Sequence, residues 1–224
     1  MKRTMLFALY GLIALLVLGA IAFKVFQPVQ VVPRIRLAPG FSLVDQDGQR
    51  LTNEDLRGYF VLYNFSYTRC PENCSNLNQT MLDVQSRIEE AELGEIPIKF
   101  VTISFDPEYD TPEKLKAYAE AVGAEQGDWI FATTTNTDIL KHIIGGGFEA
   151  YYNQKEDTSF TFDPKFVLVD GWGIVRGEYR YQTLASDTDR ILRHIRVLAD
   201  EVKNSQGSAT LAYEAAHFFL CYTP

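Results

Sequence analysis

The stretch YFVLYNFSYTRCPENC, from Tyr59 to Cys74, decides the fold of this chain. Its first part, Tyr59–Tyr67, is almost entirely apolar or aromatic, as expected of a central strand that is buried on both faces. Two cysteines, Cys70 and Cys74, follow this strand directly. The sequence therefore predicts a central sheet with a pair of sulfur atoms at the end of one of its strands.

The spacing of Cys70 and Cys74 indicates chemistry at this strand end. Residues four apart at the start of a helix lie on one face, with their Cβ atoms about 5–6 Å apart. A helix N-terminus stabilises a thiolate there, and Arg69 adds positive charge, so we expect reactive sulfurs. Two adjacent thiolates can close a disulfide or bind a soft ion such as Cu(I). The alternative is a pair of structural cysteines that happen to be neighbours.

Strands and helices alternate on both sides of this stretch. We expect further strands at Phe41–Val44, Ile96–Phe105, Asp128–Thr133, Lys165–Asp170 and Ile174–Tyr181. Helices are expected to begin at Thr52–Asp55, to lie near Ser75–Ala91, Pro112–Val122 and Asp187–Val202, and to end at Gly145–Gly147 after Thr137–Ile144. This order is typical of an α/β fold, a thioredoxin-like domain with a central mixed sheet flanked by helices.

The composition excludes several classes of protein. Hydrophobic residues make up 46% of the 224 residues and charged residues 22%, which is the balance of a foldable globular chain. With 21 basic and 29 acidic residues, the formal net charge is −8. A surface this acidic excludes binding of a nucleic-acid backbone as the main activity. Three cysteines are too few for a disulfide scaffold.

The N-terminus carries a candidate membrane anchor. Met5–Phe23 is uncharged, and a helix of this length covers roughly 28 Å, close to the thickness of the hydrocarbon core. Lys2 and Arg3 precede it and favour a cytoplasmic N-terminus. The alternative is a cleaved signal peptide, because Ala20–Ala22 resembles a cleavage site. We expect a retained single span in the bacterial cytoplasmic membrane, with the domain on the periplasmic side.

The chain divides into four segments by composition. We expect a transmembrane anchor at 1–24, a proline-containing stalk at 25–39, a thioredoxin-like domain at 40–204 and an apolar C-terminal tail at 205–224. Pro28, Pro33 and Pro39 make the stalk semi-extended, because proline resists both helix and strand pairing.

The tail needs an apolar surface to pack on. Leu211–Tyr222 carries a single charge, Glu214, and is too short to span a bilayer. Its own domain, a partner and the lipid surface are the three candidates. Because a folded domain already has its core filled, we predict that the tail docks on another subunit or at the membrane interface. His217 and Cys221, four residues apart, are a further candidate metal pair.

Several motifs together resemble one known family, the Sco/SenC proteins. These motifs are Phe41–Asp45 with Gly48, Phe65–Cys74, Ser104–Leu115, Trp129 and Phe166–Asp170. The resemblance runs from about Pro39 to Leu198. It implies a membrane-anchored, thioredoxin-fold copper-handling factor that helps to assemble the dinuclear copper centre of cytochrome oxidase.

The resemblance also implies a copper site, from which this chain departs. Cys70 and Cys74 match two Cu(I) ligands of the family, and its third ligand is a histidine shortly before the strand matched by Phe166–Asp170. Counting back from that strand reaches Phe162, which has no donor atom. Asp163 offers only a hard carboxylate, a poor match for Cu(I). Binding of Cu(I) would therefore depend on the thiolates of Cys70 and Cys74 alone.

The remaining histidines and one proline complete the candidate site residues. His142 and His194 are expected to be surface residues. Thioredoxin-like proteins place a cis-proline before the equivalent strand, facing the cysteines, which makes Pro164 a candidate. An ordinary trans turn residue is the alternative and is favoured by the general preference of X-Pro bonds.

Three functions remain open. The leading hypothesis is an assembly factor for the electron-transport chain, which delivers Cu(I) or reduces the disulfide of a copper-site client through Cys70 and Cys74. The second is a copper-free accessory subunit of a membrane-bound respiratory or photosynthetic electron-transfer complex, with a static disulfide. The third is a plain thiol–disulfide oxidoreductase, the most that this chain is expected to be as an enzyme. The expected partner is an oxidase subunit or electron-transfer complex, contacted through the tail and the transmembrane helix.

Overall fold

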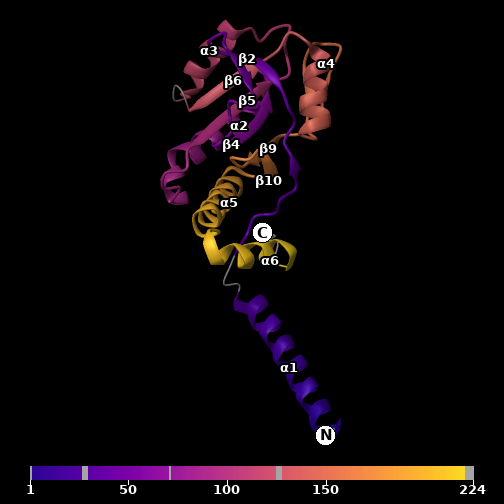
Figure 1. The fold of residues 1–224 in the computed structure, drawn as a ribbon. Helices are drawn as coiled ribbons and strands as arrows, with labels where there is room; N and C mark the ends of the chain where they lie inside the picture. Colours follow the sequence, from indigo (N-terminus) through magenta and orange to yellow (C-terminus); the bar gives the residue numbers. More distant parts are fainter. Residues whose placement is uncertain (1, 27–29, 71, 125–127, 220–224) are drawn as a thin grey trace.

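The fold is a mixed sheet between two layers of helices, with a long N-terminal helix that projects from it (Figure 1). A computed structural model describes residues 2–26, 30–70, 72–124 and 128–219. Within these residues the main sheet has eight strands in the order β1-β10-β9-β4-β5-β6-β2-β3, and β7 and β8 form a separate hairpin. The strands are β1 (Arg36–Leu37), β2 (Ser42–Asp45), β3 (Arg50–Thr52), β4 (Phe60–Ser66), β5 (Ile98–Ser104), β6 (Trp129–Thr133), β7 (Tyr152–Gln154), β8 (Phe160–Phe162), β9 (Lys165–Val169) and β10 (Ile174–Arg180).

The helices vary widely in length. The α-helices are α1 (Lys2–Phe26), α2 (Glu72–Ser86), α3 (Pro112–Val122), α4 (Thr137–Leu140), α5 (Leu184–Asn204) and α6 (Thr210–Phe219). The 3₁₀ turns η1 (Ile88–Ala91) and η3 (Gly207–Ala209) follow α2 and α5, and the π-helix η2 (Lys141–Gly147) continues α4. The predicted α/β class, with a mixed sheet flanked by helices, is confirmed.

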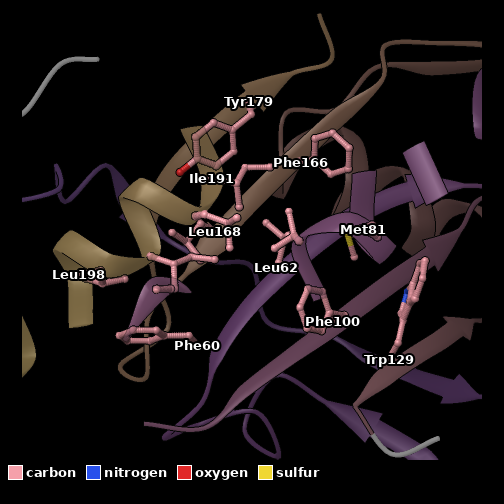
Figure 2. Packing of buried hydrophobic residues seen from close by; sticks show 14 of the residues in the cluster. Phe60, Leu62, Met81, Phe100, Trp129, Phe166, Leu168, Tyr179, Ile191 and Leu198 are labelled. Atoms are coloured by element: carbon pink, nitrogen blue, oxygen red, sulfur yellow. The ribbon is translucent and has the colours of Figure 1, made fainter. Parts of the chain in front are cut away.

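The apolar run Tyr59–Tyr67 forms the central strand as predicted. All seven residues of β4 are buried, and β4 pairs in parallel with β5 and antiparallel with β9. Phe60 and Leu62 belong to the apolar cluster formed with α2, α3 and α5, which Figure 2 shows together with Met81, Trp129 and Leu198. The alternate residues Val61, Tyr63 and Phe65 belong to a second cluster, with α4 and η2. This double burial explains why the strand reads as a continuous apolar run.

Two helix predictions are confirmed in detail. Thr111 is the N-cap of α3, and Pro112 occupies its first turn, where a missing N–H costs nothing. α5 covers the predicted Asp187–Val202, and its apolar stripe is buried in the first cluster through Ile191, Ile195 and Leu198.

Three helix boundaries differ from the prediction. The turns at Thr52–Asp55 do not start a helix: the Asp55 carboxylate accepts hydrogen bonds from the amide and hydroxyl of Thr52, which closes a turn, and β4 begins soon after at Phe60. The helix predicted at Ser75–Ala91 begins earlier, at Glu72, and its last turn is the separate 3₁₀ turn η1. The glycines Gly145–Gly147 do not end a helix after Ile144, because the backbone continues through them as a π-helix.

The predicted stalk is partly a piece of the domain. Val31 and Val32 are fully buried, and Arg36–Leu37 forms the edge strand β1, which pairs with β10. Pro39 packs so closely on Gly147 that a Cβ at that glycine would collide with the proline ring. An edge segment tolerates proline because its outer N–H groups have no partner strand, and the intervening valines supply side chains for the core.

α1 contains one segment that is long and apolar enough to cross a membrane. This segment, Arg3–Ala22, has a mean hydropathy of 2.5 and is not buried within the molecule. By length and composition it agrees with the predicted anchor, although a signal sequence passes the same test.

The tail is helical and rests on its own domain. Glu214 of α6 receives two hydrogen bonds from the guanidinium of Arg34, and His217 Nε2 lies 3.0 Å from Glu201 Oε1 of α5. Ala216 is fully buried. The described part of the tail therefore packs on its own domain through polar contacts. These contacts were not part of the prediction that the tail docks on another subunit or at the membrane interface. Cys221, the proposed metal partner of His217, lies outside the described residues.

Candidate functional site

The candidate site lies where β4 ends and α2 begins. The chain passes from the buried Tyr67 through Thr68 and Arg69 to Cys70, and α2 starts at Glu72. The Cys70 amide donates a hydrogen bond to the Tyr67 carbonyl at 3.2 Å, and its side chain is half-buried against the second apolar cluster. The sequence prediction of a cysteine between a central strand and a helix N-terminus is confirmed.

Cys70 is disulfide-bonded. Cys74 lies in the first turn of α2, four residues further along the chain, but its side chain falls outside the described residues. The pairing of these two cysteines is therefore still a prediction.

A single buried carboxylate, Asp110, fixes the start of the cysteine loop (Thr68–Cys70). Asp110 is fully buried and accepts hydrogen bonds from the amide and the hydroxyl of Thr68 and from the hydroxyl of Ser104. Ser104 ends β5, and Asp110 precedes α3. The carboxylate thus ties the cysteine loop to the end of the neighbouring parallel strand.

A second carboxylate, Asp106, holds the residue next to the cysteine. The Arg69 guanidinium donates to Asp106 Oδ2 from Nε at 2.9 Å and from a terminal nitrogen at 2.6 Å, and it stacks over the Tyr109 ring. Burial raises the pKa of Asp106, and the Arg69 charge opposes this rise. Arg69 remains about one-third exposed, so its guanidinium is held by Asp106 and is still open to solvent.

An aromatic cluster stands behind the cysteine loop. Phe160 and Phe162 of β8 pack against Tyr67 and Phe105, with ring centroids 5.0–6.2 Å apart. Phe162, at the position expected to hold the third copper ligand, is therefore an apolar packing residue. The neighbouring Asp163 is exposed, and its amide donates to the Tyr151 carbonyl.

The histidines do not supply a substitute ligand in the described part of the chain. No group of three or more His, Cys, Asp or Glu side chains suited to a metal occurs among the described residues. His142 is exposed, as predicted. The prediction of a surface position for His194 is wrong: it is buried, its Nδ1 lies 2.8 Å from the Tyr179 hydroxyl, and burial lowers its pKa to about 4. Helical spacing places His194 beside charged residues, but β10 covers that side of α5.

The candidate cis-proline is a trans residue. No peptide bond among the described residues is cis, and Pro164 is one of them. The trans form of an X-Pro bond is favoured by about 0.5–1 kcal/mol, and Pro164 follows that preference. The Pro164 carbonyl accepts a hydrogen bond from the Tyr181 amide, which continues the pairing of β9 with β10.

A cavity of about 280 Å³ is lined by Phe105, Asp106 and Phe160, and also by Lys141 of η2 and Gln154 of β7. It is connected to the cysteine loop through Asp106, which accepts hydrogen bonds from Arg69. Strand β7 and the two aspartates, Asp106 and Asp110, were not among the predicted site residues. The signal for the aspartates was present, because both lie in the Ser104–Leu115 motif.

The comparisons with known proteins agree with this geometry. The family model described as SCO1/SenC matches residues 31–200. An SCO2-like protein of Rickettsia typhi is 37% identical over 84 residues, which are 38% of this chain and 40% of the relative. A putative copper-binding protein of Stutzerimonas stutzeri is 28% identical over 176 residues, covering 75% of this chain and 80% of the relative.

A solved structure shows the same fold. It is that of BsSco, described as a member of the Sco family of cytochrome c oxidase assembly proteins with a disulfide switch. It superposes with a TM-score of 0.65 at 25% identity, over 76% of this chain and 97% of that one. Because the family model covers most of the sequence and the thioredoxin-like fold agrees, the chain belongs to the SCO1/SenC family.

Proposed function

We propose that this protein is an assembly factor for the electron-transport chain that acts by thiol–disulfide exchange at a copper-site client, through Cys70 and Cys74. The observation that carries the proposal is the disulfide-bonded state of Cys70 just before the start of α2, where Arg69 is its neighbour in sequence. A helix N-terminus and a neighbouring cation both stabilise a thiolate, which is the reactive form in exchange. The description of BsSco as containing a disulfide switch supports this choice.

The proposed exchange transfers two electrons from the cysteine pair to the client. In the reduced protein, one thiolate attacks the client disulfide, forms a mixed disulfide and releases one client thiolate. The second thiolate then attacks the mixed disulfide, releases the other client thiolate and closes the Cys70–Cys74 bond. A dithiol reductant of the thioredoxin class returns the pair to its reduced form. The cavity beside the loop gives the client chain a place to lie during this exchange.

Copper enters this proposal as a cargo of the reduced pair. Two soft thiolates suit Cu(I), and the Stutzerimonas stutzeri relative is described as a putative copper-binding protein. Phe162 offers no donor atom and packs against Tyr67 and Phe105. We therefore expect Cu(I) to be held by Cys70 and Cys74 alone and to pass readily to a client with more ligands.

A peptide assay tests the exchange. The reduced full-length protein, in detergent, is mixed with a peptide whose two cysteines form a disulfide, and the thiols of both are counted by mass after alkylation. We expect one peptide disulfide to be reduced for each protein disulfide formed, and the Cys74→Ser variant to stop at the mixed disulfide. Cys221→Ser is the matched control and should react like the parent. If the peptide stays oxidised and the cysteine pair of the parent protein stays reduced, the exchange proposal is wrong.

A second prediction concerns the missing copper ligand. Replacing Phe162 with His should place an imidazole where the family has its histidine and tighten Cu(I) binding at least about tenfold, or about 1.4 kcal/mol. Competition with a Cu(I) chelator measures this affinity. Thr161→His, on the opposite face of the same strand, is the matched control and should leave the affinity unchanged. Equal affinities for parent and Phe162→His would show that position 162 does not face the cysteines.

An accessory subunit is the second candidate function. Two observations favour it: the disulfide state of Cys70 and the apolar packing of Phe162 both suit a static, copper-free site. Purification in mild detergent at natural abundance separates the two functions. Stoichiometric co-migration with a respiratory or photosynthetic complex would support the subunit, and a free monomer would support the assembly factor.

We further propose that α1 holds the protein in the bacterial cytoplasmic membrane with the domain on the periplasmic side. The basic residues Lys2 and Arg3 before the apolar segment support this orientation. Protease added to intact inside-out vesicles should leave the domain uncut, as followed with an antibody against it. Digestion of the domain in these vesicles would show that the domain lies on the cytoplasmic side.

A further inference from the structure

The helix α6 is fixed to its domain through one polar face. The Arg34 guanidinium donates two hydrogen bonds, of 2.9 and 3.1 Å, to the Glu214 carboxylate. His217 contacts Glu201 of α5 from the next turn, and Ala216 between them is fully buried. These contacts set the rotation of α6 about its axis, because they bind two consecutive turns on the same side.

The opposite face of α6 is apolar and exposed. Leu211 is 80% exposed, and Ala212 and Ala215 are exposed as well. These positions share one side of the helix, because residues three and four apart lie above one another. None of them carries a charge. An exposed leucine of this kind is unfavourable in water unless another surface covers it.

The chain connectivity places α6 close to the end of α1. α1 ends at Phe26, and the domain begins with the buried Val31. At about 3.3–3.6 Å per residue, the connection between them reaches at most about 18 Å. Arg34, which binds Glu214 of α6, follows three residues after Val31. Figure 1 shows α6 across the end of the domain from which α1 leaves.

From these three observations we propose that α6 lies on the lipid surface beside α1, with Leu211, Ala212 and Ala215 turned toward the acyl chains. A short helix with one fixed polar side and one uncharged apolar side is the form of an interfacial helix. The bilayer is the surface that covers this apolar face, because α1, as the membrane anchor of the proposed function, brings α6 to the bilayer in every copy of the protein. The covalent connection to α1 and the contact of α6 with the lipid would together hold the domain in one orientation. The cysteine loop would then lie at a defined height above the membrane.

Depth-dependent fluorescence quenching tests the inference in pure lipid. The full-length Leu211→Trp variant is reconstituted into vesicles of phosphatidylcholine and phosphatidylglycerol, with and without bromine on the acyl chains. We expect bromine to reduce the emission added by the new tryptophan by at least half. Ile139→Trp, on α4, is the matched control: its side chain is also exposed and apolar, and it should not be quenched. The parent protein, with Trp129 and Trp172, supplies the background.

Two results would overturn the inference. No quenching of Leu211→Trp would mean that α6 stays in water, and its apolar face would then belong to a protein partner, which pure-lipid vesicles lack. Equal quenching of Ile139→Trp would mean that the domain has no fixed orientation on the bilayer. Flotation of the parent protein with the vesicles is measured separately, so that failure of the anchor is distinguished from failure of α6.

Discussion

Replacement of Arg176 by methionine is expected to lower the free energy of unfolding by about 3–5 kcal/mol, because it removes the cation from a buried ion cluster. Arg176 is 1% exposed and forms ion pairs with Asp170 at 2.9 Å and with Glu201 at 2.6 Å. It also donates to the carbonyl oxygens of Val32 and Pro33. Methionine fills a similar volume but removes the Arg176 donor from two buried carboxylates and from the carbonyl groups of Val32 and Pro33.

Urea unfolding of the full-length protein in detergent, followed by far-UV circular dichroism, measures this loss. Arg196→Met is the matched control: Arg196 pairs with Glu92 at 2.9 Å, but both side chains are more than half exposed. An exposed ion pair contributes about 0–1 kcal/mol, so this variant should unfold almost like the parent. A loss below about 1 kcal/mol in Arg176→Met would show that water or the neighbouring His217 satisfies the carboxylates.

This ion cluster also joins the segments that surround the sheet. Arg176 lies on β10, Glu201 on α5 and Val32 in the segment that leads from α1. His217 of α6 contacts the same Glu201. The connection from α1 and the helix α6 therefore converge on one buried cluster, so a change in this cluster should affect the placement of α6 as well as stability.

The central part of the fold could be predicted because its signals are local. Burial of β4 on both faces gives a continuous apolar run, and the N-cap Thr111 with Pro112 marks the start of α3 within three residues. The amphipathic stripe of α5 is likewise complete within its own segment. The cysteine motif was identified from its spacing and its position after the apolar run, and the structure places Cys70 between β4 and α2.

One error has a local origin, and two arise from long-range contacts. Thr52–Asp55 carries capping residues, but the short distance to β4 leaves only turns there. The charged neighbours of His194 suggested the surface, whereas Tyr179 from β10 covers it. The segment before β1 has the prolines of a linker, yet Arg176 holds its carbonyl groups from β10. The turn at Thr52–Asp55 is local, whereas Tyr179 and Arg176 lie 15 or more residues from their partners in sequence.

The candidate site likewise combines local signals, which the sequence shows, with long-range contacts, which it does not. Cys70 and Cys74 were identified from spacing alone, but the residues that hold the cysteine loop lie about forty positions away, at Asp106 and Asp110. Their importance follows from geometry, because parallel strands β4 and β5 end at the same edge of the sheet and bring these loops together. The Ser104–Leu115 motif therefore acts through its support of the cysteine loop.

Replacement of Asp110 by alanine is accordingly expected to weaken both the fold and the exchange activity. Three donors, the Thr68 amide, the Thr68 hydroxyl and the Ser104 hydroxyl, would lose their acceptor in a fully buried place. A hydrogen bond to a charged group contributes about 1.5–3 kcal/mol, so we expect a loss of about 3–4 kcal/mol after partial rearrangement. Hydrogen exchange of the Thr68 amide should rise at least about tenfold above that of the amides within β4.

The exchange activity distinguishes a local role of Asp110 from a general loss of stability. Under conditions where Asp110→Ala is still folded, reduction of the peptide disulfide should slow, because the loop no longer holds Cys70 at the start of α2. Asp47→Ala is the matched control, since Asp47 pairs with Lys116 on the exposed surface and contacts no part of the loop in the described structure. Asp110→Asn keeps one acceptor but turns an amide group toward the remaining donors, so its effect should fall between those of the parent and Asp110→Ala. An Asp110→Ala protein with unchanged Thr68 exchange and an unchanged rate of peptide reduction would show that the cysteine loop is positioned by Arg69 and Asp106 alone.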